Sequence, residues 1–218
     1  EGAYLPVIEL STTQAGRAYV VANDYRRSDF RPFLYRTSDY GQSWKRIADE
    51  SHIEGHALSV VQDPEYTDLL WLGTDRGLYF TFDGGQNWNH FDQEFPSVSV
   101  TDLKIHPREH DLIIGTFGRA AWILDDSRPF RKMARNKELL DADFATFPAP
   151  TAYQANYRSY QGIRFIAQGE YVGENRGSGA RMTYWLKPPV DEEENEDEEP
   201  KEKIEVKIVD SEGDTIRT

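Results

Sequence analysis

Cysteine is absent from this chain of 218 residues. That absence excludes a disulfide framework and any metal site or catalysis based on thiolates. Long apolar runs are missing too, so the sequence predicts no membrane-spanning helix, and its first six residues lack the pattern of a signal peptide. Basic residues are outnumbered, with 25 Lys and Arg against 38 Asp and Glu and a net charge of −13. Because no basic stripe is available to meet phosphates, the composition argues against nucleic acid as a partner.

What the chain does contain is one short motif in two copies. Each copy reads hydroxyl residue, any residue, Asp, any residue, Gly, any residue, small polar residue, Trp. The two Asp residues, at positions 39 and 83, lie 44 positions apart. A period of this length is typical of propellers, in which each repeat forms one small antiparallel sheet, or blade. The motif residues are Thr37, Asp39, Gly41 and Trp44 in the first copy and Thr81, Asp83, Gly85 and Trp88 in the second.

The residue types of this motif, the Asp box or BNR repeat, indicate a structural turn. An Asp side chain accepts hydrogen bonds from backbone N–H groups ahead of it and so folds a hairpin turn. The Gly supplies a positive φ, and the Trp ring is expected to be buried against the blade. We therefore interpret Asp39 and Asp83 as structural residues and not as catalytic ones.

Strand-like runs and the turns between them recur with nearly the same spacing as the motif, which supports the repeat independently. Strands are expected at 17–22 and 33–37, at 58–62, 69–73 and 78–82, and at 100–105, 112–115 and 121–124. The corner Asp63-Pro64 returns as His106-Pro107, 43 positions later. The third repeat keeps neither the Gly nor the Trp of the box, so it is expected to be the last blade. Three blades cannot close a ring, so the sequence predicts a segment of a longer propeller or a chain covered by a partner, with a compact three-blade monomer as the alternative.

The composition changes after the repeats. Residues 1–130 are predicted to be the C-terminal blades of a β-propeller, residues 131–150 a linker with a short helix or loop, and residues 151–218 part of an immunoglobulin-like β-sandwich. The sandwich strands are expected at 180–187 and 203–210. Between them, eight of the nine residues at 191–199 are acidic, which predicts a solvated loop because like charges repel. The spacing of a structured calcium loop is missing from this segment.

The order of motifs resembles one family. The segments 31–41, 72–79, 106–116 and 118–126 are similar to the end of the propeller in bacterial sortilin-like BNR-repeat proteins, which are large exported proteins often labelled glycosyl hydrolases. The resemblance implies an all-β chain outside the cytoplasm of a bacterium, with a β-sandwich module after the propeller. One departure is Phe117, where the family usually has His, so a polar role at that position is not carried over.

The sequence does not single out the residue sets that propeller sialidases, other propeller glycosidases or zinc sites require. Propeller sialidases need three clustered arginines, and other propeller glycosidases need two facing carboxylates. Six arginines are available, but their spacing singles out no triad, and no carboxylate pair can be named; the six are Arg26, Arg27, Arg31, Arg36, Arg76 and Arg119. His52 and His56 lie four apart across Gly55, which does not favour a zinc helix. We expect no metal and no cofactor.

Two classes of function remain open. The first is a non-enzymatic propeller scaffold that binds a protein or peptide, and the second is a glycan-active propeller, either hydrolase or lectin-like. Aromatic and Arg side chains interleave at Tyr153, Tyr157, Arg158 and Tyr160, a pattern common at protein contact surfaces. The sequence favours the other interpretation of these residues, an edge strand that packs on the propeller, because aromatic side chains also fill ordinary cores.

Overall fold

The computed structural model describes residues 2–152, 179–187, 207–209 and 212–217, and it is built from antiparallel sheets with only short helices. The predicted contact residues at 153–160 and the acidic segment at 191–199 lie outside the described residues. Contacts divide the chain into a unit from Glu1 to Lys187 and a second unit from Pro188 to Thr218.

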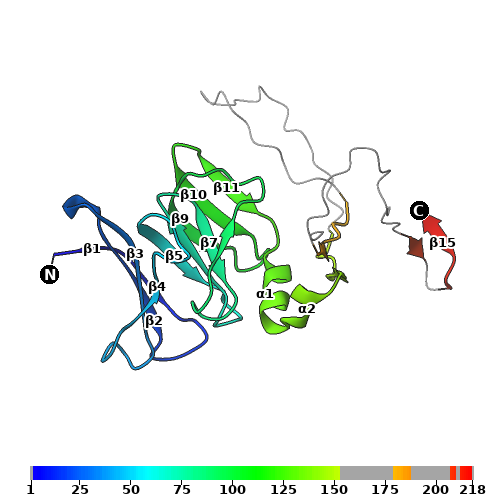
Figure 1. Ribbon diagram of the computed structural model, residues 1–218. Coiled ribbons are helices and arrows are strands. Elements are labelled where there is room, and N and C mark those ends of the chain that lie inside the picture. The colour runs from blue at the N-terminus through cyan, green and yellow to red at the C-terminus, as the bar shows by residue number, and fades with distance from the viewer. Residues whose placement is uncertain (1, 153–178, 188–206, 210–211, 218) are drawn as a thin grey trace, which may run out of the picture. The chain divides into compact units, whose positions relative to one another are not determined.

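Three antiparallel sheets follow one another along the first unit (Figure 1). In each sheet the strand order in space equals the order in sequence, as in the blade of a propeller. The first sheet holds β1 (Tyr4–Leu10), β2 (Ala18–Asp24), β3 (Asp29–Thr37) and β4 (Lys45–Ala48), with the 3-10 turn η1 (Tyr25–Arg27) between β2 and β3. The second holds β5 (Ala57–Gln62), β6 (Leu70–Thr74), β7 (Leu78–Thr81) and β8 (Asn89–Phe91). The third holds β9 (Ser99–Ile105), β10 (Leu112–Phe117) and β11 (Ala121–Leu124).

The fold class expected from the period is therefore the one observed: all-β, with successive blade-like sheets. The sequence-based strands correspond to β2, β3, β5, β6, β7, β9, β10 and β11 within a few residues at each end. Three strands of these sheets were missed. β1 carries Pro6, a residue confined to the edges of sheets, while β4 and β8 are short and begin with polar residues.

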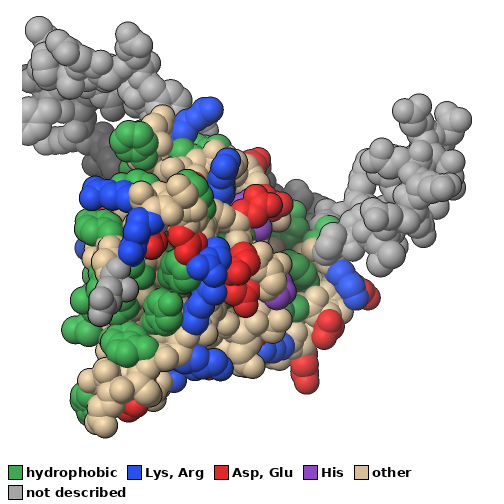
Figure 2. Space-filling view, turned by 60° about the vertical axis from the view of Figure 1, so that its left-hand side comes forward, with side chains coloured by type: hydrophobic (Ala, Val, Ile, Leu, Met, Phe, Trp, Pro, Cys, Tyr) green, Lys and Arg blue, Asp and Glu red, His purple; other side chains and the backbone are tan. Residues whose placement is uncertain are grey.

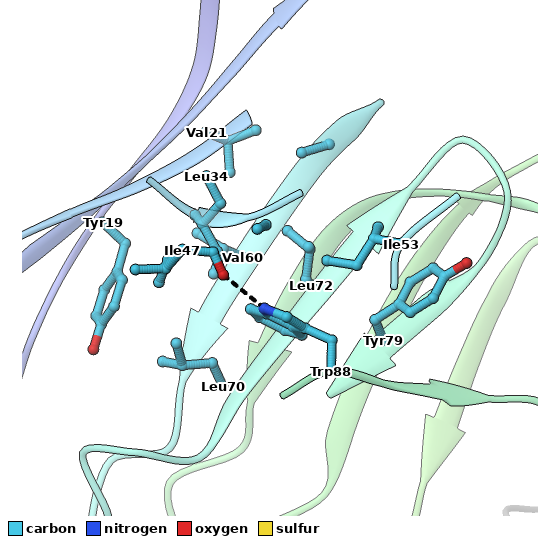
Figure 3. Close-up of a cluster of buried hydrophobic side chains, with 12 residues drawn as sticks. Tyr19, Val21, Leu34, Ile47, Ile53, Val60, Leu70, Leu72, Tyr79 and Trp88 are labelled. Carbon is cyan, nitrogen blue, oxygen red and sulfur yellow. Dashed lines mark hydrogen bonds between the residues drawn. The ribbon is translucent and has the colours of Figure 1, made fainter. Parts of the chain in front are cut away.

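The first and second sheets pack face to face around one apolar core. Tyr19, Val21 and Leu34 from the first sheet meet Val60, Leu70, Leu72 and Tyr79 from the second. All of these side chains are buried. Figure 3 shows the Trp88 ring reaching across this core from the second sheet, with its indole nitrogen directed at the Ile47 carbonyl of β4.

The second and third sheets pack around another core, and a helix completes it. α1 (Arg128–Arg135) follows β11 and begins with Pro129 in its first turn, where proline fits because no intrahelical donor is needed. The Phe130 ring contacts Trp71 at 4.9 Å and Phe80 at 5.4 Å between ring centroids. The third sheet has no fourth strand among the described residues. The linker at 131–150 was expected to hold a short helix or a loop; the structure has two helices there, α1, which begins before it, and the short α2 (Glu138–Asp141).

A buried ion pair fastens α1 to the second sheet. The Arg131 guanidinium donates two hydrogen bonds to the Asp63 carboxylate, at 2.8 and 2.9 Å, and both side chains are almost completely buried. Asp63 also accepts the backbone N–H groups of Glu65 and Tyr66, which shapes the corner before β6. The Asp-Pro corner found in the sequence therefore has a second role, as the anchor of the helix.

Four short strands remain. β12 (Phe144–Thr146) pairs with β13 (Tyr184–Leu186) in the first unit, and β14 (Ile208–Val209) pairs with β15 (Thr215–Arg217) in the second. β13 and β14 fall in the segments expected to be strands of the sandwich. Most of residues 151–218 are outside the described residues, so the sandwich module and the proposed domain boundaries stay predictions.

The buried pair gives a first prediction. Arg131→Leu leaves the Asp63 carboxylate buried without its cation, so we expect the free energy of unfolding to fall by about 3 kcal/mol. The matched control is Arg135→Leu one turn later. There the exposed guanidinium donates to the Glu65 carbonyl and lies over the Tyr66 ring, and the expected loss is below about 1 kcal/mol. Urea denaturation measures both. Equal losses in the two variants would contradict the anchoring role.

Candidate functional site

The first Asp box forms the turn between β3 and β4. The Asp39 carboxylate accepts the Ser43 backbone N–H at 2.9 Å and the Ser43 hydroxyl at 2.5 Å. The Thr37 hydroxyl donates to the same carboxylate at 2.8 Å and accepts the Gly41 N–H at 2.9 Å. Gly41 has φ +85°, a conformation that other residues rarely adopt. Side chains of the motif thus accept hydrogen bonds from the backbone N–H groups of the turn.

The second box repeats this arrangement between β7 and β8. Asp83 accepts the Asn87 N–H at 2.9 Å and the Asn87 side-chain amide at 2.7 Å. Thr81 donates to Asp83 at 2.8 Å and accepts the Gly85 N–H at 3.1 Å. The same eight-residue pattern therefore builds the same turn twice.

Hydrogen bonding keeps both box carboxylates ionised. Bonds from Ser43 and Thr37 lower the pKa of Asp39 to about 2. Burial acts to raise the pKa of Asp83, but the bonds from Asn87, Thr81 and Gln86 outweigh it and lower the pKa. A group with a depressed pKa stays charged at neutral pH and cannot serve as a general acid. The boxes offer hydrogen-bond acceptors that are already occupied by their own turns.

The two box tryptophans differ in burial. Trp88 is 7% exposed, and its indole N–H donates to the Ile47 carbonyl at 2.7 Å. Trp44 is 44% exposed, so the expectation that both rings are buried is wrong for the first box. The reason is that the box tryptophan packs on the preceding sheet, and no sheet precedes β1–β4 in the described chain.

The arginines considered for a sialidase-like triad do not gather at one point. Arg27 and Arg31 form ion pairs with Asp24 and Asp29 in their own loops, and Arg36 donates to the Gly84 carbonyl. Among the histidines, His52 is exposed and His106 accepts backbone N–H groups of its own corner through Nδ1. Of these arginines, only Arg31 and Arg76 line one hollow of the surface, and the buried His56 lies beside it.

That hollow is an open depression of about 1060 Å³ between the first and second sheets. It is lined by the start of β3, the β4–β5 loop and the β6–β7 turn. The Asp boxes follow the far ends of β3 and β7. Residues 29–32 of β3 line the depression, so the remaining five residues of that strand, about 17 Å, separate it from the first box. Its lining includes one aromatic ring and several charged side chains, namely Phe30, Asp29, Arg31, Glu50, Glu54 and Arg76.

Beside the depression, three rings and one carboxylate fix the loops. The His56 ring is buried and stacks on Tyr25 with 5.3 Å between centroids, while Phe30 lies at 6.1 Å. The His56 backbone N–H donates to Asp75 Oδ1 at 2.8 Å. Gly55 is required here because a Cβ on it would lie 2.0 Å from that oxygen. The rings of Tyr25 and Phe30 remain 40% and 56% exposed, so they form an apolar rim.

The charges of the depression are mixed and largely fixed. The Arg31 guanidinium lies 2.6 Å from the Asp29 carboxylate and holds its pKa at about 2. Glu50, hydrogen-bonded by its own backbone N–H and by Arg46, also has a lowered pKa. Arg76 lies 3.8 Å from Asp75, and its side chain is 67% exposed. The arrangement suits recognition of a ligand with polar and apolar groups better than proton transfer.

Sequence reasoning found the boxes but missed this depression. His56 was weighed only as a metal ligand, and Phe30 carried no motif. The depression joins residues from three separate loops, and only the Gly-containing turns at 55 and 77 hint that those loops approach closely. Among the residues that the structure describes, no three His, Asp or Glu side chains gather to hold a metal ion.

Comparison with known proteins identifies a sortilin-like segment. Residues 33–137 match the family model Sortilin-Vps10, described as sortilin, neurotensin receptor 3. A vacuolar protein sorting/targeting protein 10 from Fusarium vanettenii is 34% identical over 83 residues, and one from Leptosphaeria maculans is 26% identical over 81 residues. Each match covers 37% of this chain and 5% of the fungal protein, so the chain spans a small fraction of these relatives. The bacterial part of the resemblance receives no support from these fungal relatives.

Solved structures give weaker likenesses. The GH74 enzyme of Niastella koreensis aligns with a TM-score of 0.48 and 17% identity, over 56% of this chain and 21% of that one. YCF48 bound to D1 peptide aligns with a TM-score of 0.42 and 18% identity, over 57% of this chain and 37% of that one. Among the described residues, no helix has the length and apolar character needed to cross a membrane.

The box geometry yields a second prediction. Asp83→Ala removes the acceptor for two backbone N–H groups, so we expect the free energy of unfolding to fall by about 1–3 kcal/mol, with ligand binding unchanged in the folded fraction. Asp92→Ala, at an exposed position in the loop after β8, is the control and should change stability by less than about 0.5 kcal/mol. A stable Asp83 variant that has selectively lost binding would overturn the structural interpretation.

Proposed function

We propose that this chain is a segment of a non-enzymatic β-propeller that binds a protein or peptide at the depression between its first two sheets. The observation that carries the proposal is the surface of that depression, in which the exposed Phe30 ring lies among arginine and carboxylate side chains. Aromatic and Arg side chains are the residues that most often supply binding energy in protein contacts. The loops that hold them belong to packed sheets, so the surface is preformed.

The family match supports a protein ligand in a second way. The curated relatives are named for the sorting and targeting of vacuolar proteins. The matched residues include the β4–β5 loop and the β6–β7 turn that line the depression, while the lining residues 28–32 precede the match. With the match goes a setting outside the cytoplasm, which we propose for this protein. We also propose that it works together with further blades or a partner, and that the aromatic segment at 153–160 adds to the contact surface.

A glycan-active propeller is the second candidate. Its favouring observation is that Tyr25 and Phe30 present exposed rings near several carboxylates. A glycosidase, however, needs one carboxyl group with a raised pKa as general acid. Asp29 and Glu50 have lowered pKa values instead. The geometry therefore favours binding over hydrolysis, and a lectin-like role is the form of this candidate that stays testable.

A selection experiment separates the candidates. We expect a phage library of random 12-residue peptides, selected on residues 1–218, to yield peptides whose affinity falls at least about tenfold on Phe30→Ala or Arg76→Glu, since a central contact is worth more than about 1.4 kcal/mol. Lys45→Glu is the matched control, because this exposed cation follows the first box at the opposite end of the sheet. The affinity of the selected peptides for the Lys45→Glu variant should equal their affinity for the unchanged chain.

Two results contradict the proposal. One is a selection whose peptides bind all four proteins equally, which places the binding surface elsewhere. The other is a glycan array in which the chain binds an oligosaccharide and loses that binding in the Phe30 and Arg76 variants, which favours the second candidate.

A further inference from the structure

The lining of the depression carries more negative than positive charge. Figure 2 shows acidic and basic side chains interspersed over the side of the molecule that carries the first sheet, so the charge that a ligand meets depends on which groups are already paired. Four carboxylates and two guanidiniums line the depression, namely Asp29, Glu50, Glu54 and Asp75, and Arg31 and Arg76.

Two of these carboxylates have a guanidinium of their own. Arg31 lies 2.6 Å from the Asp29 carboxylate, and Arg46 lies 2.7 Å from the Glu50 carboxylate. Arg46 belongs to β4 and is not part of the lining, so it adds a positive charge from behind the surface. A ligand cation gains little from either carboxylate, because each charge is already neutralised by the protein.

Asp75 is engaged too, which leaves Glu54 as the exception. Asp75 Oδ1 accepts the His56 backbone N–H at 2.8 Å, and its other oxygen lies 3.8 Å from Arg76 Nε. The exposed Glu54 carboxylate, by contrast, has no hydrogen bond or ion pair with any residue that the structure describes. The negative charge that the depression leaves without a partner is therefore that of Glu54.

The backbone that carries Glu54 is held on both sides. Ile53 before it is buried in the core between the first two sheets, and the Glu54 N–H donates to the Tyr79 hydroxyl at 3.1 Å. Two residues later, the His56 carbonyl accepts the Asp75 N–H at 3.2 Å, in addition to the bond from the His56 N–H to Asp75 Oδ1. Because this backbone is fixed, an ion pair at Glu54 costs only side-chain entropy.

We infer that the depression binds its peptide through a basic side chain, Lys or Arg, that pairs with Glu54 and lies close to an apolar side chain that packs on Phe30. The inference rests on the proposed function, peptide binding at the depression, and adds the chemistry of the ligand. A depression of 1060 Å³ is about 10 Å across, the length of about three extended residues, which sets the spacing of the two side chains. Arg76, whose side chain is 67% exposed, donates to backbone carbonyls of the same peptide.

Other occupants complement this surface less well. A neutral oligosaccharide accepts or donates hydrogen bonds but brings no positive charge to Glu54. A second copy of the chain has a net charge of −13, so the two molecules repel one another on average. A metal ion lacks ligands, since no three His, Asp or Glu side chains gather to hold one in the part of the chain that the structure describes. A basic peptide supplies the missing charge.

A peptide selection with a variant at Glu54 tests this chemistry. The random 12-residue library is selected on residues 1–218, and peptides that lose binding on Phe30→Ala are synthesised with an acetylated N-terminus. Each peptide is also made with its Lys or Arg replaced by Met, which keeps an apolar side chain and removes the charge. Affinities of both forms are measured for the unchanged chain, for Glu54→Gln and for Glu94→Gln.

Glu94→Gln is the matched control. Glu94 is an exposed glutamate without an ion-pair partner among the described residues, and it lies in the β8–β9 loop and outside the depression. We expect replacement of the basic residue by Met to weaken binding at least about fivefold in the unchanged chain and in Glu94→Gln, and less than about twofold in Glu54→Gln. A selection on Glu54→Lys should yield peptides with Asp or Glu instead.

Three results overturn the inference while the proposed function stands. The first is a set of Phe30-dependent peptides without a basic residue. The second is a Met replacement that costs as much in Glu54→Gln as in the unchanged chain. The third is loss of binding on N-terminal acetylation, which assigns Glu54 to a terminal amine. A selection in which no peptide depends on Phe30 contradicts the proposed function itself, and the inference fails with it.

Discussion

Packing of one sheet on the next, fixed at the rim by an Asp box, is the interaction on which the rest of this structure depends. The box uses its own side chains to complete a tight turn, and that turn directs a Trp ring onto the preceding sheet. The hydrogen bond from Trp88 to the Ile47 carbonyl sets where the outermost strand of one sheet lies against the next. The Trp88 ring also fills the core beside Val60, Leu70 and Leu72. One residue therefore both fixes the position of one sheet on the next and supplies buried apolar surface.

The candidate binding surface is a consequence of that packing. The depression is lined by loops of two neighbouring sheets, so its shape is set by the angle at which the sheets meet. Asp75 fixes the β4–β5 loop by accepting the His56 N–H, and the close approach of Gly55 leaves no room for a side chain. Ion pairs hold Arg31 in place. These contacts hold the lining side chains in place, and the lowered pKa values of Asp29 and Glu50 keep both carboxylates charged at neutral pH.

Much of the fold could be predicted from the sequence because the Asp box is local. All the atoms that shape its turn come from eight consecutive residues, so spacing alone identifies it. The outermost strands β4 and β8 could not be predicted, since Lys45 and Asn89 begin them and long-range pairing decides their conformation. Burial of Trp44 was predicted wrongly because it depends on a neighbouring sheet and not on the motif. The depression was missed for the same reason, as its residues meet only through tertiary contacts.

The central claim is that a box tryptophan reports whether a sheet lies in front of it. Hydrogen exchange of the two indole N–H groups, followed by NMR in residues 1–218, measures this directly. The account predicts slow exchange for Trp88, whose proton is held by the Ile47 carbonyl inside the core, and exchange at nearly the rate of a free indole for Trp44. Equal rates for the two protons, fast or slow, would contradict it.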